Sequence, residues 1–175
     1  IRGTLGEITE SRRLVEQALA DYPEFHGFNT CQRGYYTYVP YLLGGDYLRA
    51  SDILMKDFRN SNPEVAWQAA AGEKAGVLLE LAGNVDRAQK TWGEVEKMYP
   101  PSRCAFYSGL AKALRENGEP DLDRMDFHSL LRSEMAGLVS LLYKNRGAKD
   151  LAEDLVRLHI IFFRESRYGR FRQPP

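Results

Sequence analysis

The chain has 175 residues, of which 43% are hydrophobic and 27% are charged, so it can bury the core of about one globular domain. Its 24 lysine and arginine residues balance its 24 aspartate and glutamate residues, which excludes a strong overall field for nucleic acid or an anionic membrane. No apolar run approaches the roughly 20 residues of a membrane span, and two cysteines make no disulfide framework, so we expect a soluble chain in a reducing intracellular compartment.

The first predicted helix follows Gly6 and ends at Pro23, in the stretch GEITESRRLVEQALADYP. A small residue, Ser11, comes five positions after the glycine, and a large apolar residue, Val15, comes nine positions after it. Gly6 should end an earlier helix that these residues do not contain. We therefore expect a fragment, or a chain whose missing helix comes from a partner, with self-association or assembly through this incomplete repeat.

The next segment, GYYTYVPYLL, is rich in residues that favour strands and contains Pro40. We predict a kinked helix here, because the segments on both sides have helical patterns. Its tyrosines have two interpretations that the sequence leaves open. Tyr35, Tyr36 and Tyr41 either line a binding groove or fill the core between helices.

The pattern of the first stretch recurs in GDYLRASDILMKDFRNSNP, from Gly45, and in GNVDRAQKTWGEVEKMYP, from Gly83. Glycine ends a helix in the left-handed conformation, the small residue lets the next helix approach closely, and proline starts the following unit. The spacings of 39 and 38 residues therefore predict repeated helical hairpins that stack on one another. The small and large positions hold Ala50 and Leu54 in one copy and Ala88 and Trp92 in the other. The same offsets from Gly147 give Ala152 and Val156, without a proline at the end.

The register changes after Gly83. We predict a first helix over 102–118, a loop over 119–126, one long amphipathic helix over 127–147 and a last helix over about 149–167. The acidic loop is not a calcium site of the EF-hand type, because Asp126 and Arg132 stand where glycine and glutamate are required. Residues 1–118 thus form the repeats, and 119–175 form an irregular helical pair that caps them.

The three repeated stretches resemble the second helix of the tetratricopeptide repeat (TPR) family. Gly76 and Ala111 match the small position of that family's first helix, whereas Tyr38 departs from it. The resemblance implies an all-α fold, a right-handed superhelix of stacked antiparallel hairpins. It also implies a protein-interaction scaffold whose concave groove holds a peptide segment or a partner helix. Chaperone-tail binding is not expected, because the carboxylate clamp of such family members is missing at Tyr35, Val39, Lys74, Ala105 and Gly109.

The first helices should line this groove. Tyrosine, glutamate, lysine and arginine would make it a mixed polar and aromatic surface suited to a peptide. Tyrosine and the basic residues also have ordinary roles in the core or in solvent. The register places in the groove Gln32, Tyr35, Val39, Ala70, Glu73, Val77, Glu80, Ser108, Lys112 and Arg115.

No motif predicts catalysis, a cofactor or a metal. The sequence has no phosphate loop, HExxH, GxSxG or CxxC motif. His26, His128 and His159 are far apart, and Cys31 and Cys104 are expected to be buried small side chains.

The tail RESRYGRFRQPP carries four arginines. They could contact RNA or an anionic membrane, or could complement the dipole of the last helix. Two alternatives to the scaffold therefore remain: a structural subunit that packs through its ends and outer helices, and an RNA- or membrane-contacting module that uses the tail.

Overall fold

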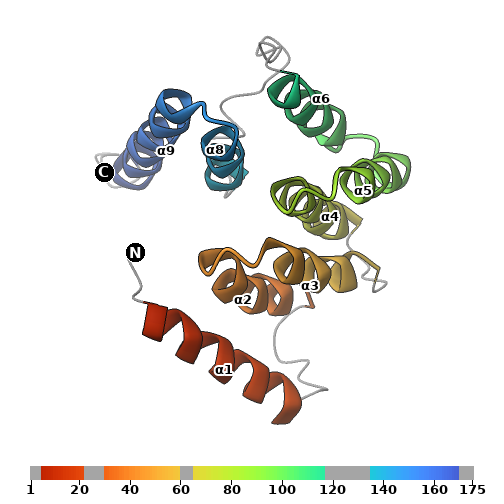
Figure 1. Ribbon diagram of the computed structural model, residues 1–175, viewed down its shortest axis with the longest axis vertical. Helices are drawn as coiled ribbons and strands as arrows, with labels where there is room; N and C mark the ends of the chain where they lie inside the picture. Colours follow the sequence, from red (N-terminus) through yellow and green to blue (C-terminus); the bar gives the residue numbers. More distant parts are fainter. Residues whose placement is uncertain (1–4, 22–29, 60–64, 117–134, 170–175) are drawn as a thin grey trace, which may run out of the picture. The chain divides into compact units, whose positions relative to one another are not determined.

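The computed structural model describes the backbone of residues 5–21, 30–59, 65–116 and 135–169 (Figure 1). Within these ranges, side chains are described except at positions 5, 6, 15, 19, 30–36, 57, 65, 67 and 161–169. Every regular element in the described ranges is a helix, which confirms the predicted all-α class. In chain order the helices are α1 (Leu5–Asp21), α2 (Thr30–Leu43), α3 (Tyr47–Arg59), α4 (Val65–Leu81), α5 (Val85–Met98), α6 (Cys104–Arg115), α8 (Met135–Asn145) and α9 (Lys149–Gly169).

The helices divide between two compact units, Ile1–Cys104 and Ala105–Pro175. Helices α1 to α5 belong to the first unit, and α8, α9 and all of α6 after Cys104 belong to the second. The boundary expected from the sequence, at residue 118, falls in the range 117–134, outside the described residues, as does the predicted acidic loop.

The turns after α2, α4 and α8 have the same backbone geometry. In each, a glycine has a positive φ: 74° at Gly45, 77° at Gly83 and 86° at Gly147. Two hydrogen bonds close each turn in the pattern of the Schellman motif, which satisfies the last carbonyls of the helix. The prediction that these glycines end helices is confirmed. The bonds run from the N–H of Gly45 to Leu42 O (3.0 Å), Asp46 to Tyr41 O (2.9 Å), Gly83 to Glu80 O (3.0 Å), Asn84 to Leu79 O (2.8 Å), Gly147 to Lys144 O (3.2 Å) and Ala148 to Tyr143 O (3.0 Å).

Gly6 does not form such a turn, because it is the second residue of α1. The prediction that Gly6 follows the end of an earlier helix is therefore wrong for these residues. A glycine that ends a helix in the left-handed conformation lies outside that helix, whereas Gly6 lies in the first turn of α1.

The small residue five positions after each turn glycine is buried in all three hairpins. Its N–H donates the first hydrogen bond of the new helix, at 3.0 to 3.1 Å, to the carbonyl of the residue that follows the glycine. The large residue four positions further on is buried in α3 and α5, as Leu54 and Trp92, whereas Val156 of α9 is 39% exposed. The three buried small residues are Ala50, Ala88 and Ala152.

Helix α4 packs against both α3 and α5 through close contacts at two glycines. A Cβ atom on Gly76 would collide with the indole of Trp92, and the indole Nε1 donates to the carbonyl of Glu73 at 3.2 Å. A Cβ atom on Gly72 would collide with Val95 of α5 and would lie 3.0 Å from Phe58 of α3. The small residues of α4 therefore let the helices on its two sides approach its backbone.

Helix α2 covers the segment GYYTYVPYLL and contains Pro40, so the predicted helix over this segment is confirmed. Tyr38 and Tyr41 are buried, which makes Tyr41 a core residue in the first unit. The side chains of Tyr35 and Tyr36 lie outside the described residues.

In the second unit, α8 and α9 form a hairpin around Gly147. Leu138 and Leu142 of α8, and Ala152 and Leu155 of α9, are buried. The buried hydroxyl of Ser140 donates to the carbonyl of Ala152 at 3.1 Å. The last predicted helix is confirmed by α9, and the predicted helix over 127–147 is described only from Met135 onward.

Among the described helices, none combines the length and the apolar composition that a span across a lipid bilayer requires.

Candidate functional site

The groove residues predicted for the first unit differ in their accessibility. Val39 on α2 and Glu73 on α4 are half-buried, and so is Ala70. Val77 and Glu80 are 0% and 1% exposed, so their side chains belong to the interior and present no surface to a partner. Gln32 and Tyr35 lie on the backbone of α2, and their side chains lie outside the described residues.

The remaining predicted residues lie on α6, in the second unit. Lys112 is exposed, and Ser108 and Arg115 are half-buried. The predicted groove residues are thus divided between two units, with an accessible set in each. The residues that remain accessible in the described structure are Val39, Ala70, Glu73, Ser108, Lys112 and Arg115.

Glu73 connects α4 to the segment that leads into α6. One carboxylate oxygen accepts a hydrogen bond from the backbone N–H of Arg103, the residue before α6, at 2.7 Å. Burial raises the pKa of Glu73, and the Arg103 N–H and the nearby charge of Lys74 oppose this rise. The position of Glu73 is therefore that of a capping acceptor for a neighbouring segment rather than that of a side chain directed freely into a groove.

A second polar junction joins α1 to the end of α2. The guanidinium carbon of Arg12 lies 5.3 Å from the centre of the Tyr41 ring, and Arg12 Nε donates to the carbonyl of Pro40 at 3.4 Å. The hydroxyl of Tyr41 donates to the carboxylate of Glu16 at 2.7 Å. Arg12 and Glu16 are four positions apart on α1, so one face of this helix holds both the ring and the hydroxyl of one tyrosine.

Gly44 lies directly against the guanidinium of Arg12. A Cβ atom at Gly44 would collide with the guanidinium of Arg12, with its Cζ only 2.7 Å away. Burial and the hydrogen bond to Glu16 raise the pKa of Tyr41, whereas the nearby Arg49 lowers it. We call Pro40, Tyr41 and Gly44 the α1 seat.

One pattern in the sequence belongs to the α1 seat: an arginine and a glutamate stand one helical turn apart on α1. Their target, Tyr41, lies 25 residues beyond Glu16, so only the fold brings the three side chains together. A search for motifs along the chain therefore does not find this junction.

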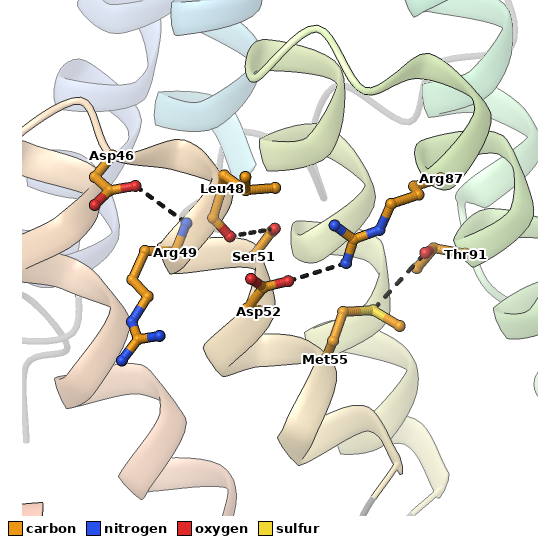
Figure 2. Close-up of polar contacts among 8 residues, drawn as sticks. All are labelled: Asp46, Leu48, Arg49, Ser51, Asp52, Met55, Arg87 and Thr91. Carbon is orange, nitrogen blue, oxygen red and sulfur yellow. Dashed lines mark hydrogen bonds and ion pairs between the residues drawn. The ribbon is translucent and has the colours of Figure 1, made fainter.

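The second helices of the two repeats in the first unit are joined by side chains (Figure 2). Arg87 Nη2 of α5 lies 2.9 Å from Asp52 Oδ1 of α3, and both side chains are nearly half exposed. The hydroxyl of Thr91 contacts the sulfur of Met55 at 3.8 Å. Exposed ion pairs stabilise a protein by only about 0–1 kcal/mol, so we expect this pair to contribute little to stability.

The described residues contain no group of three or more histidine, cysteine, aspartate or glutamate side chains that could hold a metal ion. Cys104 is buried as expected, and burial raises the pKa of its thiol to about 12, which keeps it protonated and unreactive. His159 is half-buried. The described side chains do not include those of His26, Cys31, His128 and the arginines of the basic tail.

Comparison of the chain with models of known protein families, with curated proteins and with solved structures found no match.

Proposed function

We propose that this chain is a protein-interaction scaffold of the TPR type, in which stacked helical hairpins form a superhelix whose groove holds a peptide segment or a partner helix. The observation that carries the proposal is the recurrence of one hairpin design. The same Schellman turn, the same buried small residue and the same start of the second helix occur around Gly45, Gly83 and Gly147. Stacked hairpins of this kind build extended surfaces that are suited to binding.

The proposed binding surface uses the predicted residues that are accessible. In the first unit these include Val39, and in the second unit they include Lys112, with Ser108 and Arg115 beside it on α6. The basic and hydroxyl groups on α6 fit a peptide that carries acidic residues. In the first unit, Val39 offers an aliphatic contact to an apolar side chain. The proposal assigns the chain no catalytic step and no cofactor.

The experiment is a selection of peptides from a display library on the full chain, followed by titration of the selected peptides in solution. We expect Lys112→Glu to weaken the binding of peptides selected by α6, and Val39→Glu to weaken that of peptides selected by the first unit, each by at least tenfold. Lys90→Glu, which makes the same charge change as Lys112→Glu at an exposed position of α5, is the matched control for that variant and should leave binding unchanged. Equal binding by the two groove variants and the control would contradict the proposed surface.

A second candidate function is that of a structural subunit that packs through its end helix. Its support is the exposure of large apolar residues on α9, where Leu151, Leu158 and Ile160 are between 45% and 50% exposed. Side chains of this kind mark protein contacts when they gather on one surface. Light scattering coupled to size exclusion tests this candidate: self-association that Leu158→Glu abolishes would favour it, and a monomer at all concentrations would disfavour assembly with itself.

A further inference from the structure

One carboxyl group holds the segment that leads from α5 into α6. This segment consists of Tyr99, two prolines that have no N–H group, Ser102 and Arg103. The N–H of Tyr99 donates to Val95 O at 2.7 Å, and the N–H of Ser102 donates to Tyr99 O at 2.9 Å, so both of these bonds are local. The third N–H, that of Arg103, donates to the carboxylate of Glu73 on α4 at 2.7 Å. Among the N–H groups of the segment, it is therefore Arg103 that connects to a helix distant in the chain.

This bond lies where the chain passes from the first unit into the second. Cys104, the first residue of α6, is the last residue of the first unit, and its side chain is 0% exposed. The rest of α6 belongs to the second unit. We call the hydrogen bond from the Arg103 N–H to the Glu73 carboxylate the α6 clamp.

Ionisation of Glu73 works against the α6 clamp. Burial favours the neutral carboxyl and raises the pKa of Glu73, and the Arg103 N–H and the positive charges of Arg103 and Lys74 oppose this rise without cancelling it. When the clamp opens, water reaches the carboxyl, and its pKa returns toward the ordinary value of a glutamate. By linkage, binding of the proton favours the closed clamp, and loss of the proton favours the open one.

The other helices that pack on α4 place different groups near the clamp. On α5, the charge of Glu96, like that of Glu73, adds to the rise that burial causes in the pKa of the Cys104 thiol. From α3, the ring of Phe58 lies against Gly72, the residue before Glu73. The described side chains of α2 include no acidic, basic or histidine residue. Glu73 is thus the group whose proton acts on the clamp directly, and Glu96 offers a control.

We propose that Glu73 is a proton-controlled clamp at the joint between the two units, whose neutral form holds the segment before α6 against α4 and whose ionised form releases it. Release frees residues 99–103 from α4 and opens the Cys104 thiol to solvent, while α5 and α6 stay helical. The opening is local and needs no peptide or partner, so this inference does not rest on the proposed function.

The first test uses the full chain and follows the Glu73 carboxyl by carbon-13 NMR and the Arg103 amide by hydrogen exchange, from about pH 4 to about pH 8. We expect the protection factor of the amide, corrected for the intrinsic pH dependence of exchange, to fall as Glu73 ionises. The fall should be about tenfold for each unit by which the measured pKa exceeds the ordinary glutamate value. A pKa that is not raised, or protection that stays constant across the titration, would overturn the proposal.

Two matched variants each remove one negative charge near the clamp. Glu73→Gln keeps the acceptor oxygen and cannot ionise, so the protection factor of its Arg103 amide should not change with pH. Glu96→Gln leaves the clamp bond in place and should follow the wild type. Circular dichroism checks that both variants are folded. Identical pH courses for the two variants would show that Glu73 has no special part in the opening.

The Cys104 thiol gives an independent readout. The chain has two cysteines, so Cys31→Ala leaves Cys104 as its single thiol. In this background we expect a dipyridyl disulfide to label the chain with Glu73 faster than Glu73→Gln at neutral pH, by the same factor as the fall in protection, and to label both at equal rates in mild acid. Equal rates at neutral pH would contradict the release. None of these measurements involves the peptides that bind at Val39 or Lys112, so either proposal can fail without the other.

Discussion

The carboxyl group of Glu73 shows how one residue of a first helix can serve the fold instead of a ligand. The Glu73 carboxylate accepts a hydrogen bond from the Arg103 N–H, just before the start of α6. Burial disfavours the charged form of this carboxylate and so raises the pKa of Glu73. A group with a raised pKa in the folded state stabilises the fold fully below its unfolded pKa, and this contribution is lost as the pH rises through the folded pKa. Ionised Glu73 therefore costs stability at neutral pH.

We predict that Glu73→Gln gains stability relative to the wild type between pH 4 and pH 7, because glutamine keeps the acceptor oxygen and has no charge to bury. Glu73→Leu removes the acceptor and should cost about 1–3 kcal/mol at pH 7. Denaturant unfolding at several pH values, followed by tryptophan fluorescence, measures both effects. Glu153→Gln, at an exposed position of α9, controls for the loss of one negative charge. A Gln variant whose relative stability does not change with pH would show that the charge of Glu73 is not penalised.

Gly76 and Gly93 form a second contrast between single residues. We predict that Gly76→Ala destabilises the first unit by about 1–3 kcal/mol, because its methyl group would collide with the Trp92 indole in a packed interior. Gly93→Ala meets no neighbour and should stabilise α5 by about 0.5–1 kcal/mol through better helix propensity. We expect the two variants to shift the unfolding midpoint in opposite directions. A shift in the same direction for both would contradict the close contact between Gly76 and the Trp92 indole.

Helices α1 and α4 differ in how far their side chains are buried. Helix α4 is buried continuously from Ala75 to Leu81, whereas α1 has no buried side chain among its described residues. We predict that the backbone amides of α1 exchange with deuterium at least tenfold faster than those of α4, because helices with fewer buried side chains open more readily. Hydrogen exchange with mass spectrometry makes the comparison within one sample. Equal protection of the two helices would show that α1 unfolds only with the whole unit.

The burial of α4 also explains where the sequence-based groove was inaccurate. The groove residues were predicted as if each first helix had one exposed face. Helix α4, however, lies between α3 and α5 and packs on both. Val77 and Glu80 are therefore interior residues. The run VLLEL at the end of α4 contains the signal, because an apolar run without a polar side is typical of a helix that is covered all round.

For the whole molecule, the sequence was most informative where a local rule of the backbone applies. Glycine at Gly45, Gly83 and Gly147 could be assigned to a left-handed turn, and the buried alanines followed from the same count. The division into two units and the α1 seat depend on contacts between distant residues. The spacing of Arg12 and Glu16 is visible in the sequence, but nothing in the sequence marks Tyr41 as their partner or residue 104 as a boundary, so neither feature could be predicted.

The two units lead to a prediction for unfolding. Both tryptophans of the chain, Trp67 and Trp92, belong to the unit Ile1–Cys104, whereas helices occur in both units. We expect tryptophan fluorescence and far-ultraviolet circular dichroism to give unfolding curves with different midpoints, because only the dichroism signal reports the second unit. Coincident curves, with the same midpoint and slope, would mean that the units unfold as one cooperative structure.

The equal turns at Gly45 and Gly83 have a consequence for the history of the chain. A segment that begins and ends in the same backbone conformation can be duplicated or deleted without any new connection having to be invented. The 38 residues from one turn to the next are therefore a natural unit of insertion, and related chains should differ in length by whole hairpins rather than by single helices.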